Sequence, residues 1–169
     1  MEKEHIIKEL NRNKDVFREL LYGLSGDYIF WKQNPGKWCL LEIICHLLDE
    51  EREDFCSRVR HIFYSPELPM NPIDPAGWVK ERKYIEQDYD LILNNFSEER
   101  KKSVEWLSEL DSQNRNNIHV HPKLGELSVN MIFTNWLAHD YLHIRQIIRL
   151  KYDYLKSVSG ENLSYAGDW

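Results

Sequence analysis

The sequence has no long apolar run, and this absence excludes a membrane-spanning helix. A span needs roughly 18 or more consecutive apolar residues, whereas charged residues make up 30% of this chain and divide its hydrophobic stretches. Residues 1–5 are mostly charged and contain no apolar segment. We therefore expect neither a secretory signal nor contact with a membrane.

An excess of basic residues is missing as well. The chain has 22 Lys and Arg against 28 Asp and Glu, which gives a formal net charge of −6. Nucleic-acid binding needs clustered basic side chains that neutralise phosphates, but here they are scattered among acids. We therefore exclude nucleic acid as the main partner and interpret the negative charge as favouring solubility.

Cysteine is scarce, and its three positions, Cys39, Cys45 and Cys56, fit neither a disulfide framework nor a zinc ribbon. Reduced thiols are typical of proteins in the cytoplasm. We therefore expect a cytoplasmic protein with free cysteines.

Aromatic residues are plentiful, with six Trp, nine Tyr and six Phe, so the chain has ample apolar surface for a folded core. Its 169 residues suit one domain covering residues 1–169. Strand-like alternation is nearly absent, whereas four segments have the helical period. We expect helices over about 3–24, 39–63, 81–110 and 128–150.

The connections between these helices are long. Residues 64–78 contain four of the six prolines, a density that no helix interior tolerates. This segment predicts a stiff crossover that reaches the far end of a bundle, and the polar residues 111–127 predict a second long connection. The fold class that follows is all-α, an up-down four-helix bundle with long crossover connections.

Two histidines of the last helix, His139 and His143, are spaced i, i+4 and therefore project from one face. That face also carries Ile132, Trp136 and Ile147, so the pair lies in the apolar stripe. Unpaired imidazoles in a core cost on the order of 1–3 kcal/mol each. A shared metal ion would satisfy both rings, and the alternative is a pair of core histidines bonded to neighbouring groups.

A third histidine, His46, lies in an apolar part of the second helix but faces the acidic residues Asp49, Glu50 and Glu53. These carboxylates form either a solvated face or the lining of a cleft. In the second case Asp49 or Glu50 would accept the second ring N–H of His46.

The second connection contains His119 and His121. Histidines in loops are usually only polar surface residues, so we do not expect these two to be metal ligands.

Two stretches resemble signatures of the DinB-like (damage-inducible protein B, YfiT-type) superfamily. The first is NPGKWCLLEIICHLLDEE over residues 34–51, and the second is WLAHDYLHIRQ over residues 136–146. The resemblance covers nearly the whole chain. It implies a four-helix bundle whose metal ligands are His46, His139 and His143.

The same resemblance implies one divalent ion, with zinc or nickel favoured and iron or manganese as alternatives. It also implies homodimers and, in some branches, transfer or isomerisation chemistry that uses low-molecular-weight thiols. Cys39 stands where the family commonly has serine. A thiol at a helix N-terminus can have a lowered pKa, but we assign Cys39 a capping role with Glu42.

Three imidazoles leave at least one coordination position open, as in catalytic sites. The ion would then lower the pKa of a bound water or bind a thiol as thiolate. Asp49, Glu50 or Glu53 would be the general base, and Gln146 and Trp136 would contact the substrate.

Three functions remain open at this point. The first is a metal-dependent transferase or hydrolase that acts on a small molecule, with a thiol as possible cofactor. The second is a non-catalytic metal-binding protein with a role in stress or protein interaction. The third is a structural bundle with core histidines.

Overall fold

The computed structural model describes residues 2–24, 26–110 and 116–167. Its helices are α1 (Lys3–Leu21), α2 (Gly26–Phe30), α3 (Leu40–Asp49), the π-helical η1 (Glu50–Phe55), α4 (Cys56–Tyr64), α5 (Pro75–Glu81), the 3₁₀ turn η2 (Tyr84–Glu86), α6 (Tyr89–Glu109), α7 (Val129–Ser159) and the 3₁₀ turn η3 (Leu163–Ala166). The strands β1 (Ile118–His121) and β2 (Gly125–Ser128) pair antiparallel as a hairpin.

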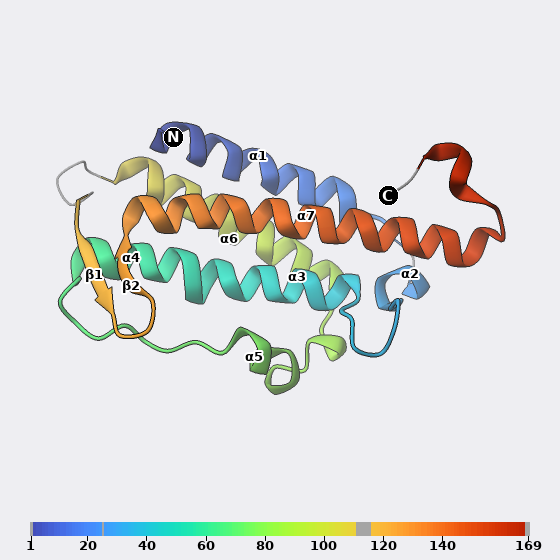
Figure 1. The fold of residues 1–169 in the computed structure, drawn as a ribbon, viewed down its shortest axis with the longest axis horizontal. Helices are drawn as coiled ribbons and strands as arrows, with labels where there is room; N and C mark the ends of the chain where they lie inside the picture. Colours follow the sequence, from blue (N-terminus) through green and yellow to red (C-terminus); the bar gives the residue numbers. More distant parts are fainter. Residues whose placement is uncertain (1, 25, 111–115, 168–169) are drawn as a thin grey trace.

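Four long helical segments form the bundle predicted from the sequence: α1, the continuous run α3–η1–α4, α6 and α7 (Figure 1). The α1 and α7 segments run in one direction, while α3–η1–α4 and α6 run in the other (Figure 1). This arrangement requires the proline-rich crossover, which returns the chain along the whole bundle before α6 begins. None of the described helices combines the length and apolar character needed to cross a membrane.

The expected start of the third helix at residue 81 is wrong. Helix α5 ends at Glu81, and Lys83 adopts a left-handed conformation with φ of 48°, which breaks the helix. Helix α6 begins only after Asp88, whose side chain accepts the N–H of Leu91 at 2.8 Å and caps the new N-terminus.

Two further helix ends differ from the prediction. Helix α1 stops at Leu21, and α7 continues to Ser159, nine residues beyond the predicted end near Leu150. Gly160 with φ of 68° ends α7 because glycine accepts the left-handed conformation without steric cost. The expected polar connection 111–127 contains the β-hairpin instead, apart from residues 111–115, which lie outside the described part of the chain.

The bundle core consists of two apolar clusters separated by a polar layer at mid-length. On α6, Phe96 belongs to one cluster and Leu107 to the other, and the buried Arg100 lies between them. On α7, Leu137 and Ile147 mark the two clusters in the same way. This polar layer contains the functional side chains described next.

Candidate metal centre

His46, His139 and His143 come together in the polar layer. His46 is near the end of α3 and the other two are on α7. The Nε2 atom of His139 lies 3.3 Å from Nε2 of His46 and 3.1 Å from Nε2 of His143. Among the described residues these three form the one group of possible metal ligands whose donor atoms all lie within 4.8 Å of one another.

These separations fit a shared divalent ion. Metal–nitrogen bonds of about 2.0–2.1 Å place two tetrahedral ligands roughly 3.3–3.4 Å apart. A facial octahedral set with the same bonds has separations of roughly 2.8–3.0 Å. The observed Nε2–Nε2 distance of 3.3 Å matches the tetrahedral value, and the distance of 3.1 Å lies between the tetrahedral and octahedral values. The three histidines could therefore bind an ion after small movements of their rings.

A hydrogen bond fixes the orientation of His143. Its Nδ1 donates to the side-chain oxygen of Gln146 at 2.8 Å, so the ring carries its proton there. The lone pair is then on Nε2, which faces His139. This is the usual arrangement of a metal-binding histidine and its outer partner.

His46 lacks an equivalent hydrogen bond. Its Nδ1 is buried and has no hydrogen-bond partner among the residues that the structure describes. Oε1 of Glu50 lies 3.9 Å away, which is too long for a hydrogen bond. The ring of Trp38 packs against His46 with 4.9 Å between centroids, so the imidazole is held largely by apolar contacts.

Burial keeps all three imidazoles neutral. Desolvation, followed by the neighbouring histidine charges, lowers the pKa of His139 to about 2. The same causes lower the pKa of His46 to about 3, and burial lowers the pKa of His143. Neutral imidazole is the form that binds a metal, so in this environment protons compete little for the ligands near pH 7.

The three candidate bases have different surroundings. Burial and then Asp54 raise the pKa of Glu50 to about 8, so Glu50 and His46 are both neutral at pH 7 and form no ion pair. Glu50 lies beside Nδ1, on the side of the His46 ring away from the other histidines. Its position favours an outer partner of His46 over a base at the open coordination position.

Asp49 and Glu53 are engaged elsewhere. Asp49 accepts the hydroxyl of Tyr84 at 2.6 Å and lies 3.0 Å from Arg82. Glu53 forms a two-pronged ion pair with the same guanidinium. The structure therefore directs both carboxylates to Arg82 and does not bring them to the histidines.

The structure places Trp136 in the core instead of in a cavity wall. It is 1% exposed, its indole N–H donates to Glu51 at 3.1 Å, and its ring stacks on Phe55. A substrate entering from solvent would not reach it. The ring of Phe55 also lies 5.0 Å from that of His139, so this aromatic pair packs beneath the histidines.

The π-helical segment explains how Phe55 reaches this place. One extra residue in a helical turn rotates everything after it back by about 100°. On an unbroken α-helix Phe55 would lie opposite His46, and the π segment returns it to the side that faces α7. The predicted continuous helix is thus correct in extent but lacks this local widening.

A buried ionic network that the sequence did not reveal lies beside the histidines. Arg100 donates to both oxygens of Asp140 at 2.7 and 2.8 Å and to Glu51 at 2.8 Å. Asn13 donates to Asp140 at 3.1 Å, and Trp136 donates to Glu51. The network therefore joins all four segments of the bundle and immobilises the backbone on either side of His139.

His119 and His121 do not join the metal ligands. Nδ1 of His119 lies 2.8 Å from the carbonyl oxygen of Pro66, and its ring packs on that of His61. Nδ1 of His121 accepts the backbone N–H groups of Lys123 and Leu124 in the turn of the hairpin. Both histidines thus fix the hairpin, as expected for residues without a ligand role.

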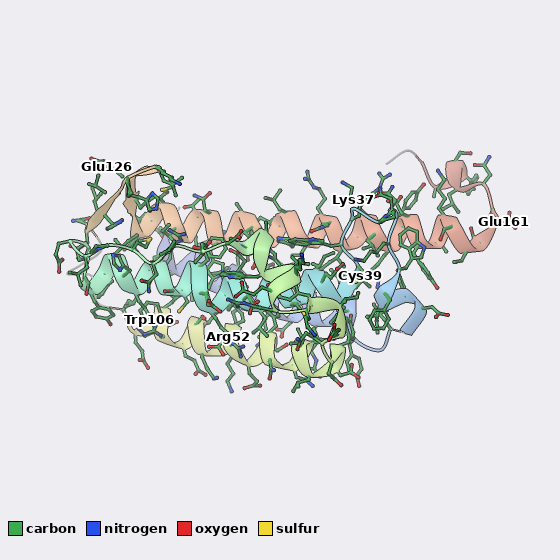
Figure 2. The ribbon with its side chains drawn as sticks, turned by 90° about the horizontal axis from the view of Figure 1, so that it is seen from below. Lys37, Cys39, Arg52, Trp106, Glu126 and Glu161 are labelled. Carbon is green, nitrogen blue, oxygen red and sulfur yellow. The ribbon has the colours of Figure 1, made fainter. Side chains whose placement is uncertain are left out.

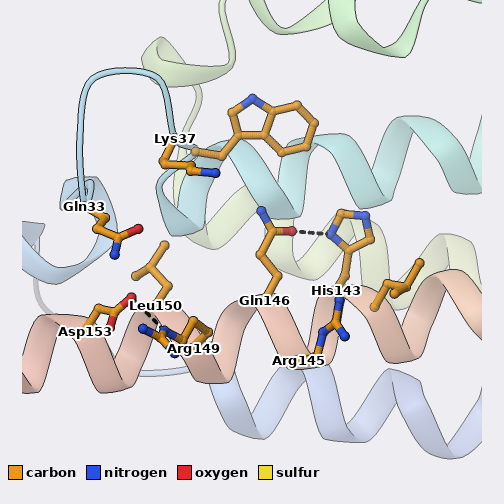
Figure 3. A pocket seen from close by; sticks show the side chains of 10 residues that line it. Gln33, Lys37, His143, Arg145, Gln146, Arg149, Leu150 and Asp153 are labelled. Carbon is orange, nitrogen blue, oxygen red and sulfur yellow. Dashed lines mark hydrogen bonds and ion pairs between the residues drawn. The ribbon is translucent and has the colours of Figure 1, made fainter. Parts of the chain in front are cut away.

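A cavity of about 760 Å³ opens beside the metal centre, between α7 and the loop before α3 (Figure 3). Lys37 reaches over it from the loop, while His143 and Gln146 rise from α7 (Figure 3). Trp38 and Leu150 add apolar walls. Lys37 and Trp38 both lie in the first signature stretch, but no local pattern marked them as site residues.

The fold and the site define a class of protein: a helical bundle whose three converging histidines could bind a metal ion. Residues 9–147 match the sequence pattern of the DinB superfamily. The chain therefore belongs to this superfamily, as the resemblance of the two signature stretches predicted.

Among solved structures, the fold is similar to that of YfiT from Bacillus subtilis, with a TM-score of 0.79 and 16% sequence identity. The similarity covers 89% of this chain and 86% of YfiT. YfiT is described as a probable metal-dependent hydrolase with an unusual four-helix bundle topology. No curated protein matches the chain.

Proposed function

We propose that this protein is a metal-dependent hydrolase or transferase that acts on a small molecule, with His46, His139 and His143 as ligands of one divalent ion. The convergence of three neutral Nε2 atoms is the observation that carries this proposal. It is supported by the family and by the description of YfiT as a probable metal-dependent hydrolase.

The protein groups around the ion would have distinct tasks. Gln146 holds the ring of His143 so that Nε2 keeps its lone pair. Trp38 and Phe55 shield the rings of His46 and His139 from water. A divalent ion in this site lowers the pKa of a water or a thiol that binds it, and this is the chemistry of hydrolysis or thiol transfer.

Zinc and nickel suit three imidazole ligands well, and iron and manganese bind such sites more weakly. A low-molecular-weight thiol as cofactor would make the protein a transferase, whereas water as the second reactant would make it a hydrolase. A non-catalytic metal-binding role in stress or interaction is the competing proposal, because three histidines can also bind an ion without turnover.

Metal analysis combined with activity screening tests the proposal. Chelator-treated protein is titrated with Zn²⁺ and Ni²⁺, and then assayed with model esters and with electrophiles in the presence of cellular thiols. We expect one ion per chain, lost in His143→Ala and kept in His5→Ala, whose histidine is exposed. Turnover that depends on the ion supports the enzyme, and a bound ion without any turnover supports the non-catalytic protein.

We also propose a homodimer, as the family resemblance implies. The last turns of α7 project beyond the bundle (Figure 1), and Leu155 and Val158 there are 52% and 59% exposed. Analytical ultracentrifugation of Leu155→Glu/Val158→Glu would give a monomer if this surface is the interface. Ile85→Glu, at an exposed apolar residue elsewhere, is the matched control.

A further inference from the structure

The cavity beside His143 is basic in a protein of net negative charge. Its lining includes Lys37, Arg145 and Arg149 against the single acidic residue Asp153. Arg149 is paired with Asp153 at 3.0 Å. The side chains of Lys37 and Arg145 have no ion-pair partner within residues 2–24, 26–110 and 116–167. Two cations are thus available to an anionic ligand beside the metal centre.

A second cavity, of about 310 Å³, reaches the metal centre from the side of His139. Its walls are mainly apolar and come from α7, from the β-hairpin and from Phe55, while its charged lining residues, Asp54 and Arg58, form an ion pair with each other. Leu124 and Met131, which line it, are 62% and 41% exposed, so apolar surface faces solvent at its mouth. This cavity suits a hydrocarbon or aromatic group instead of a charge.

The two cavities adjoin along α7. Leu142 lines both of them. His139 lines the apolar cavity, and His143 lines the basic one. Ala138, Leu142 and Gln146 follow at successive turns of the same face, so the distance from the apolar to the basic part is about 12 Å. In Figure 2 Glu126 of the hairpin lies beside the start of α7, and Lys37 lies farther along the helix, before its end.

We propose that the groove formed by the two cavities binds an elongated carboxylate, with the anionic group between Lys37 and Arg145 and an apolar group in the cavity beside His139. The middle of such a molecule would lie over the metal centre. The inference rests on the proposed function, because it names the substrate class of the same site. It assigns specificity to residues on the loop before α3 and on the hairpin, outside the metal-binding set.

Binding measured on chelator-treated protein tests the inference without relying on the metal. The probe is 6-phenylhexanoate, and isothermal titration calorimetry compares it with two relatives: the neutral 6-phenylhexanamide and the ring-less hexanoate. We expect the full probe to bind roughly tenfold more tightly than either relative, because each lacks one of the two interactions.

Two double variants assign the preferences to the two parts of the groove. Lys37→Met/Arg145→Met is expected to remove the preference for acid over amide, and Leu124→Ser/Met131→Ser to remove most of the preference for the phenyl group. All four side chains are exposed, so the fold should be retained. Lys8→Met/Arg12→Met, which removes two exposed cations of α1, should leave both preferences unchanged.

Equal binding of acid and amide by the wild-type protein would overturn the inference, as would an acid preference that survives in Lys37→Met/Arg145→Met. Metal content is measured on the same preparations to separate the two proposals. Metal binding without the acid preference refutes only the substrate class. The acid preference without metal binding refutes the metal-dependent function and keeps the assignment of the groove.

Discussion

Gln146 accepts the Nδ1–H of His143 at 2.8 Å, and this hydrogen bond determines which ring nitrogen faces the other two histidines. Gln146 also lines the basic cavity, so one side chain links the proposed metal centre to the space for a ligand. The contact of Gln146 with a substrate is a prediction from the sequence, and its contact with His143 is a feature of the structure.

Replacing Gln146 by Leu is expected to weaken metal binding by about 10–100-fold, because the ring of His143 loses the partner that fixes its tautomer. Gln146→Glu keeps an acceptor oxygen and should retain most of the affinity. Competition with a chromophoric zinc chelator measures both. Thr134→Val, on the outer face of the same helix, is the control. If it lowers the metal affinity as much as Gln146→Leu does, Gln146 has no specific role in orienting His143.

Among the charged residues, substitution of Arg100 should lower the free energy of unfolding most. Arg100→Met leaves Glu51 and Asp140 buried without their cation, which costs about 3–5 kcal/mol. Arg52→Met removes an exposed pair with Glu99 and should cost at most about 1 kcal/mol. Urea unfolding followed by circular dichroism gives both values, and similar losses in the two variants would contradict the structural role of the network.

The network also shows what the sequence could not provide. The helical period and the proline-rich crossover are local patterns that predicted the bundle, and the spacing of His139 and His143 placed this pair on one helix face. The resemblance to the DinB-like superfamily added His46 as the third ligand. Arg100 carries no such local signal: it is the first of three consecutive basic residues in its helix, and only packing in the bundle makes it a buried ion.

The π segment and the β-hairpin were missed for a related reason. No glycine or proline marks the π segment, whose sequence is EEREDF. Each strand of the hairpin has only four residues, too few for alternation to be recognised. For the candidate bases, the sequence could not foresee that Arg82 would form ion pairs with Asp49 and Glu53.

The cysteine thiols are expected to be inert in the folded protein. Burial raises the pKa of Cys39 to about 11 and outweighs the helix N-terminus, and it raises the pKa of Cys45 to about 12. At pH 7.5 fewer than roughly one Cys39 in a thousand would be thiolate. Mass spectrometry after iodoacetamide treatment should show alkylation in urea and almost none under native conditions. Rapid native labelling of Cys39 would contradict its capping role.

Acidification should destabilise the metal-free protein through the histidines. The pKa of His46 is about 3 in the folded chain and near 6.5 in the unfolded chain, so between these values only the unfolded state binds the proton. The contribution of neutral His46 to the free energy of unfolding is therefore complete above about pH 6.5 and decreases as the pH falls. Between pH 7 and pH 5 the free energy of unfolding should drop by about 2 kcal/mol because of His46.

Urea unfolding of chelator-treated protein at pH 7 and pH 5 measures this loss. His46→Phe should lose about 2 kcal/mol less than wild type over the same interval. His5→Phe replaces an exposed histidine and should show the wild-type difference. If the pH dependence of His46→Phe equals that of wild type, the imidazole is not held neutral by burial.

The central claim is that one divalent ion binds at the Nε2 atoms of His46, His139 and His143. A crystal of Zn²⁺-loaded protein, measured at the zinc absorption edge, tests it most directly. The account predicts one anomalous peak per chain at about 2.0–2.1 Å from all three Nε2 atoms. A peak bound through other residues, or no peak at the three rings despite bound zinc, would contradict it.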